Sequence, residues 1–244
     1  MPSRVLYVGS NQGYCVFLVE PRSSEILLCT PAPYAALSYC WGSDQMVTLT
    51  TTKSTYEEHR RGIGLDLLPK TLKDAVIVCR GLKIEYLWID ALCIVQDDAD
   101  DWRYESAQMQ EVYGNSYITI AAHQAESCVD GFLGQQSFGQ PAWQRPFYVL
   151  IGTGESIKMH LPTGSESWKW REGSPLMRRG WTLQEALLPR RILYYTGHEL
   201  VWECDTKILC ECGHISDPVY LRHRDPVLKT YTEISCNIEC AARQ

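Results

Sequence analysis

Two glutamates lie on predicted helical faces that they share with tryptophan. In the stretch 97–113, Trp102, Glu105, Met109 and Val112 stand at relative positions 0, 3, 7 and 10, which a helix places on one face. A carboxylate in such an apolar setting is costly unless it is hydrogen-bonded or paired. Because catalytic carboxylates with perturbed pKa values occur in such settings, Glu105 is a candidate catalytic residue.

Glu185 has a similar arrangement on a second predicted helix. Trp181, Gln184, Glu185 and Leu188 stand at relative positions 0, 3, 4 and 7. This carboxylate therefore also shares a face with tryptophan, and it is the second candidate.

Both glutamates also have a structural interpretation, as members of buried ion pairs. Four arginines lie close to Glu185 in the sequence: Arg178, Arg179, Arg190 and Arg191. The helical pattern alone leaves both interpretations open.

Aromatic residues and a glycine close an apolar run at 34–41. We expect this run to be a strand that delivers Tyr39 and Trp41 to the edge of a sheet, with Gly42 allowing close backbone approach. Their rings could stack on a base or a nicotinamide ring, or they could simply belong to the core. Ligands of α/β sheets bind beyond the carboxyl ends of the strands, so this edge is a candidate binding site.

Cys204, Cys210, Cys212 and His214 are residue types that bind zinc, in the spacing C-x5-C-x-C-x-H. The spacing fits no standard zinc knuckle, because tetrahedral sites usually bring in their thiols through C-x2-C turns. We therefore expect no bound metal and no resident cofactor.

A Cys/His hydrolase would need a nucleophile such as Cys40 or Cys93 and a base such as His123 or His198. No local signature supports that chemistry. No P-loop and no G-x-G-x-x-G follows an expected strand either, so the sequence holds no standard phosphate cradle.

The expected order of elements is that of an α/β protein. Pro69 suits the first turn of a helix, and apolar residues recur at helical spacing from there to Gly81. A strand at 86–90 follows and ends at Asp90, and the acidic run before Trp102 favours a helix start. Further strands are expected at 5–8, 14–20, 25–29, 34–41, 46–52, 116–122, 191–195, 200–204 and 207–212, a hairpin at 147–161 and a helix at 179–189.

The composition is that of a globular protein whose partners are not polyanions. The 244 residues carry a formal charge of −6, with no run of Lys or Arg that would suit nucleic acid or an anionic membrane. The start lacks the apolar core of a signal peptide, and no long apolar run could span a bilayer. Eleven cysteines lie largely in apolar runs, as buried free thiols do. We expect a cytoplasmic protein.

Three segments together resemble a known family. They are 34–42 (YAALSYCWG), then 68–113 with its LPKT, DA, YLWIDALCIVQD and DW elements, and finally 179–191, which begins RGWTLQE. Their order, spacing and content resemble the HET (heterokaryon incompatibility) domain of filamentous fungi. The resemblance divides the chain into a β-rich extension at 1–33, a HET domain at 34–214 and an unassigned tail at 215–244.

The resemblance implies a module that triggers cell death when incompatible fungal strains fuse. It also implies a distant relation to TIR domains, with a flavodoxin-like central sheet, flanking helices and additional hairpins. In that relation Glu185, four residues after Trp181, looks like the glutamate that acts on NAD, and Glu105, three residues after Trp102, departs from the pattern.

The residues implied to bind such a nucleotide substrate come from all three segments. Tyr39 or Trp41 would stack a ring and Arg179 could meet a phosphate. The full set is Tyr39, Trp41, Gly42, Asp90, Arg179, Trp181 and Gln184. The alternatives are a non-catalytic module that signals by self-assembly or through a partner protein, and a HET scaffold adapted to a metabolic role.

Overall fold

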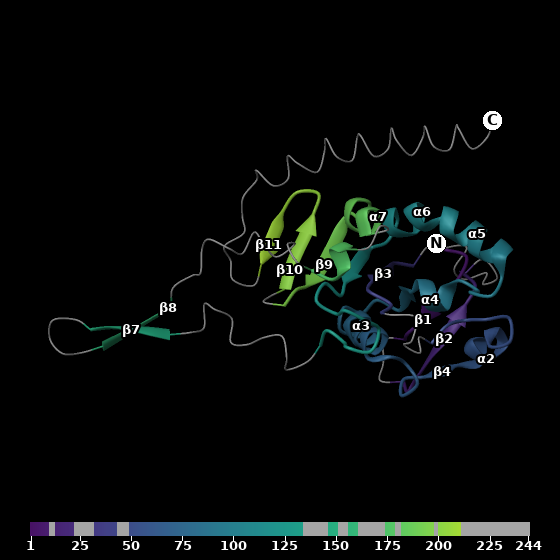
Figure 1. Cartoon of the computed structure of the whole chain (residues 1–244), viewed down its shortest axis with the longest axis horizontal. Helices are drawn as coiled ribbons and strands as arrows, with labels where there is room; N and C mark the ends of the chain where they lie inside the picture. The colour runs from purple at the N-terminus through teal and green to yellow at the C-terminus, as the bar shows by residue number, and fades with distance from the viewer. Residues whose placement is uncertain are drawn as a thin grey trace.

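The computed structural model describes residues 1–9, 13–21, 32–42, 49–133, 146–150, 156–160, 174–178, 182–197 and 200–210. They form an α/β fold around a mixed sheet of nine strands, in the order β11-β10-β9-β6-β3-β5-β1-β2-β4 (Figure 1). The strands of this sheet are β1 (Val5–Tyr7), β2 (Cys15–Val19), β3 (Tyr34–Ser38), β4 (Ile63–Gly64), β5 (Tyr86–Trp88), β6 (Ile118–Ala121), β9 (Arg191–Tyr195), β10 (Leu200–Cys204) and β11 (Ile208–Cys210). The helices are α2 (Tyr56–Arg61), α3 (Lys70–Gly81), α4 (Asp90–Cys93), α5 (Ala99–Ala107), α6 (Met109–Gly114), the 3₁₀ helix η4 (Leu176–Arg178) and α7 (Thr182–Leu187).

The centre of the sheet is parallel. Strands β5, β3, β6 and β9 are neighbours in that order and run in one direction, whereas the outer strands pair antiparallel. Figure 1 shows α5, α6 and α7 in succession along one side of this sheet and α3 on the other. The central strands are buried on both faces, as expected for a parallel sheet between helices.

Helix α3 confirms the prediction from its apolar spacing. It begins directly after Pro69, and its buried stripe includes Leu72, Val76 and Cys79, each fully buried. The short loop that follows leads into β5, which places the end of that strand beside Asp90.

The helix predicted over 97–113 is two helices. Asp98 caps α5 by accepting hydrogen bonds from the backbone N–H groups of Asp100 and Asp101, and Gln108 ends α5 and starts α6. Glu105, Met109 and Val112 nevertheless stay on one buried side across this break. Glu105 is thus buried as predicted, whereas Trp102, on the same helix α5, is 48% exposed and does not share the buried face.

The N-terminal strands belong to the same sheet as the rest. Strand β1 lies between β5 and β2 and pairs antiparallel with both. The strand expected at 25–29 lies outside the described residues. Of the strand expected at 46–52, residues 46–48 lie outside them too, and Thr51 makes an isolated bridge with Val95.

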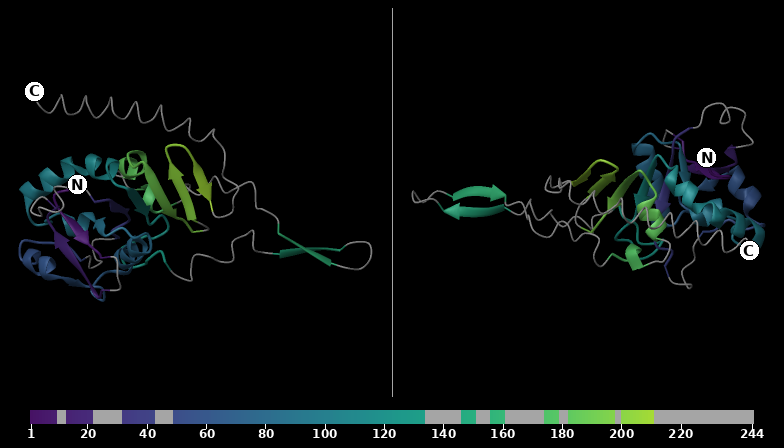
Figure 2. Two further views of the ribbon diagram at one scale, coloured as in Figure 1. Left: turned by 180° about the vertical axis from the view of Figure 1, so that it is seen from behind. Right: turned by 90° about the horizontal axis from the view of Figure 1, so that it is seen from above.

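The predicted hairpin forms a sheet of its own. Strands β7 (Pro146–Leu150) and β8 (Ser156–His160) pair antiparallel, and Figures 1 and 2 show them apart from the nine-stranded sheet. In the described part of the chain, no helix is both long enough and apolar enough to cross a membrane.

Candidate functional site

The strongest candidate, Glu185, lies against the carboxyl end of β3. Ser38, the last residue of that strand, donates a hydrogen bond from its hydroxyl to Glu185 Oε2. The two side chains are 2% and 3% exposed. The contact fixes the first turn of α7 on the central strand, so the first and third sequence segments meet here.

Trp41 and Asp90 connect the first segment to the second at the same edge. The indole Nε1 of Trp41 donates to Asp90 Oδ2 at 2.9 Å, and the backbone N–H of Ala91 donates to Asp90 Oδ1 at 2.7 Å. Asp90 thereby positions the Trp41 ring, which stays partly exposed. The predicted binding residues Trp41 and Asp90 are thus in direct contact.

The other predicted binding residues occupy different environments. Tyr39 is 1% exposed and belongs to the core, so its ring offers no free stacking face in this conformation. Gly42 is exposed and has a φ of 100°, a backbone conformation that favours glycine. Gln184 is partly buried on α7. Arg179 and Trp181 lie outside the described residues.

Glu105 has a different set of partners from Glu185. Arg4 Nη2 lies 3.4 Å from Glu105 Oε1 and 2.5 Å from Asp101 Oδ2, and Arg4 Nε donates to the carbonyl of Cys93 at 2.7 Å. Asp101 also accepts from the backbone N–H of Val95 at 2.8 Å. These contacts bind α5 to the residue before β1, and they favour the structural interpretation of Glu105.

His123 follows β6 and lies near the same edge. Its side chain is 2% exposed and its ring meets the ring of Tyr194 edge-on, with centroids 5.6 Å apart. The hydroxyl of Ser174 donates to the carbonyl of His123 at 2.5 Å. The backbone N–H of Ala122 donates to the carbonyl of Ser38 at 2.9 Å, so the ends of β3 and β6 are held side by side.

Burial disfavours Cys93 as the nucleophile of a Cys/His hydrolase. Its thiol is 1% exposed, and burial raises its pKa to about 12, so it stays protonated at neutral pH. Cys40 is also buried, and His198 lies outside the described residues.

The register of the C-terminal strands separates two of the four residues of zinc-binding type, Cys204 and Cys210. Cys210 pairs with Val201, which stands three residues before Cys204 on β10. Three residues along a strand span about 10 Å and end on the opposite face of the sheet. Cys204 and Cys210 therefore do not converge on one ion, and Cys212 and His214 lie outside the described residues.

The sequence model of the family described as heterokaryon incompatibility protein (HET) matches residues 34–185. The chain belongs to this family. It is also similar to "Heterokaryon incompatibility protein 6, OR allele" of Neurospora crassa, with 26% identity over 117 residues. That match covers 44% of this chain and 16% of the relative, so the chain corresponds to a small part of the relative's length. No solved structure matches the chain.

Two side chains of the second HET segment, Thr71 and Asp74, hold a loop against α3, a role that their sequence pattern does not predict. Asp74 Oδ2 accepts hydrogen bonds from the backbone N–H groups of Phe132 and Leu133, at 2.7 and 2.8 Å. Thr71 Oγ1 donates to the carbonyl of Ser127 at 2.9 Å and accepts from the N–H of Gly131 at 3.0 Å. The LPKT and DA elements of this HET domain thus hold the loop that follows β6 onto α3.

Proposed function

We propose that this HET domain is a fungal incompatibility module that promotes cell death, and that it does so by cleaving NAD at the carboxyl edge of its central sheet. Membership in the heterokaryon incompatibility family and the name of the Neurospora relative support the first part. We further propose that it acts in the cytoplasm, either alone or after self-assembly or contact with a death-signalling partner protein.

The order of the parallel strands supports a flavodoxin-like, distantly TIR-like core. Along the sheet, β5, β3, β6 and β9 are the second, first, third and fourth parallel strands of the chain. This 2-1-3-4 order is that of flavodoxin-like folds, which bind ligands where the first and third strands meet. In this chain that position lies between the ends of β3 and β6.

The contact between Ser38 and Glu185 is the observation that carries the proposal. It holds a carboxylate in a dehydrated setting at the end of β3, where the fold favours a ligand. Trp41, fixed by Asp90, supplies a partly exposed ring at the same edge that can stack on a nucleotide base or on nicotinamide.

The reaction would break the bond between nicotinamide nitrogen and ribose C1′. The electron pair of that bond leaves with nicotinamide, which departs as a neutral base, and positive charge develops on the ribose. The Glu185 carboxylate would stabilise this oxocarbenium ion and then accept a proton from the water that adds to C1′. The products are nicotinamide, ADP-ribose and one proton.

A non-catalytic module is the second candidate, and the burial of Glu185 favours it. A carboxylate that is 3% exposed and bonded to Ser38 could serve only to dock α7 on the sheet. In that case cell death would follow from assembly or from a partner protein.

Nicotinamide release from NAD at high protein concentration separates the two candidates. Glu185→Gln keeps the size and most hydrogen bonding of the side chain, so under the first candidate it abolishes release and barely changes the melting temperature. Glu203→Gln is the matched control, because Glu203 is 4% exposed and also accepts from a hydroxyl, that of Tyr194 at 2.8 Å. Absence of release by the unmodified protein, under conditions that promote assembly, supports the non-catalytic candidate.

A further inference from the structure

The short helix η4 is anchored at the carboxyl edge of the central sheet. Leu176 is 1% exposed and packs in a small apolar cluster with Cys40 and Ala121, at the ends of β3 and β6. The hydrogen bond from Ser174 to the carbonyl of His123 holds the residues just before η4. The backbone of 174–178 is therefore fixed on the edge that carries the proposed site.

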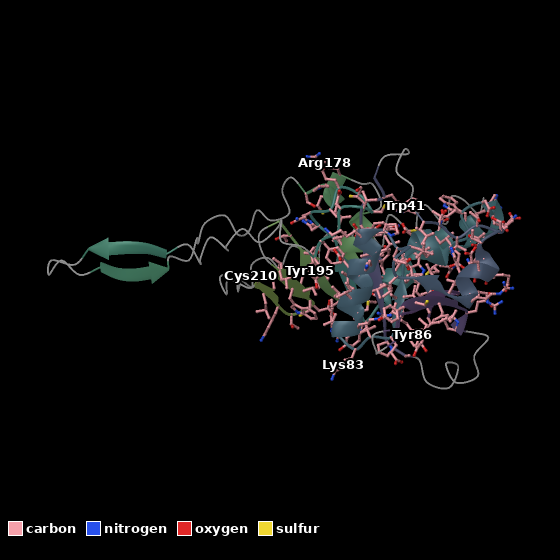
Figure 3. All side chains as sticks on the ribbon, turned by 90° about the horizontal axis from the view of Figure 1, so that it is seen from below. Trp41, Lys83, Tyr86, Arg178, Tyr195 and Cys210 are labelled. Carbon is pink, nitrogen blue, oxygen red and sulfur yellow. The ribbon has the colours of Figure 1, made fainter. Side chains whose placement is uncertain are left out.

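Arg178, the last residue of η4, projects from this anchored segment into solvent. It is exposed, and none of the hydrogen bonds and ion pairs of the described residues engages its guanidinium. Figure 3 shows Arg178 and Trp41 on the upper side of the molecule, and Lys83, shortly before β5, and Tyr86, at its start, on the lower side. The Arg178 guanidinium thus lies on the same side as the partly exposed indole of Trp41.

Several other arginines of the described part make contacts elsewhere. Arg4, Arg60 and Arg103 form ion pairs, and Arg80 donates to the carbonyl of Val8. Arg190 is exposed, but it directly precedes β9 and so lies at the amino end of that parallel strand. Arg178 is distinct because its position coincides with the edge where the fold favours a ligand.

We propose that Arg178 binds a phosphate group of the nucleotide substrate and selects phosphorylated nucleotides over nucleosides. A guanidinium presents two N–H donors in the geometry of phosphate oxygens, and such charge-assisted pairs are stronger than neutral hydrogen bonds. The chain carries a formal charge of −6, so a local cation at this edge favours the approach of a pyrophosphate group, which carries two negative charges. This inference rests on the function proposed above.

Calorimetric titration of the purified chain with NAD and with nicotinamide riboside tests the assignment. The two ligands share the glycosidic bond, and only NAD carries phosphate. Arg178→Gln is expected to weaken NAD binding about tenfold, the loss of one charge-assisted contact. It should leave nicotinamide riboside binding unchanged. Arg178→Lys should retain part of the NAD affinity, and Arg190→Gln, an equal charge change at the other end of the sheet, should change neither.

Each contrary outcome has a distinct meaning. If Arg178→Gln binds NAD as the unmodified protein does, or loses both ligands equally, the phosphate assignment is wrong and the proposed function stands. Equal affinity of the unmodified protein for NAD and nicotinamide riboside also overturns the assignment alone. If the unmodified protein binds neither ligand, the proposed function fails and the assignment fails with it.

Discussion

Ser38 and Glu185 are 147 residues apart in the chain and share a buried hydrogen bond. Removing the donor by Ser38→Ala leaves a buried carboxylate without this partner, which should lower the free energy of unfolding by about 1–3 kcal/mol. Glu185→Ala should cost a similar amount, and the double variant should cost less than the sum, since both remove one interaction. Chemical denaturation of the four proteins measures this coupling. Strict additivity would show that the contact contributes nothing.

Gly42 should be required for binding at this edge. Its φ of 100° is strained for any residue with a side chain, so Gly42→Ala should cost about 1–2 kcal/mol. We expect the variant to remain folded and soluble but to lose nucleotide binding and cell killing. Circular dichroism melting and an NAD titration check this.

Gly81→Ala is the matched control for Gly42, because an added methyl there would meet nothing within 4 Å. It should leave stability unchanged or slightly raised, and binding intact. Normal NAD binding by Gly42→Ala would remove the loop after β3 from the site.

Arg4 should matter more for stability than any surface arginine. Arg4→Met leaves two acceptors, Asp101 and the buried Glu105, without their cation, which should cost about 3–5 kcal/mol. Arg103→Met is the control, since the Arg103 side chain is 76% exposed, and it should change stability by less than about 0.5 kcal/mol. Urea denaturation distinguishes the two.

Glu105→Gln completes the comparison between the two glutamates. If Glu105 is structural, nicotinamide release by this variant should be normal under conditions where it stays folded. Loss of release without loss of stability would instead return Glu105 to the catalytic candidates.

His59 should make the stability of the fold depend on pH. Its side chain is 4% exposed and contacts Thr51 Oγ1 at 2.8 Å, and burial lowers its pKa below the ordinary 6.5, although the charge of Glu58 opposes this shift. The unfolded chain therefore binds the proton more readily. The stabilisation is fully present above pH 6.5 and is lost as the pH falls through the folded-state pKa.

His59→Gln removes this titration while keeping a polar side chain. Denaturation midpoints measured above and below pH 6.5 should fall less steeply in the variant than in the unmodified protein. Equal slopes would mean that His59 titrates alike in the folded and unfolded chains.

The local pattern of apolar and polar residues was sufficient to predict most of the helices and strands. The apolar spacing after Pro69 predicts α3, and the β-rich runs predict β3, β5, β6 and the strands β9 to β11, because side-chain periodicity follows directly from helix and strand geometry. The three segments at 34–42, 68–113 and 179–191 were also sufficient to recognise the family. The match of the family model over residues 34–185 confirms that recognition. The burial of both glutamates could be read from the same periodicity.

The partners of those glutamates were decided by tertiary structure alone. Periodicity places a carboxylate on a face but carries no information about which distant strand packs against that face. The arginines near Glu185 in the sequence give no hint of its hydrogen bond with Ser38, and nothing near Glu105 in the sequence points to Arg4, close to the N-terminus. The exposure of Trp102, on the same helix as the buried Glu105, likewise depends on how α5 packs against the rest of the fold. The contacts of Ser38 with Glu185 and of Arg4 with Glu105 join distant parts of the chain, so they arise only when β1, β3, α5 and α7 take their places around one core.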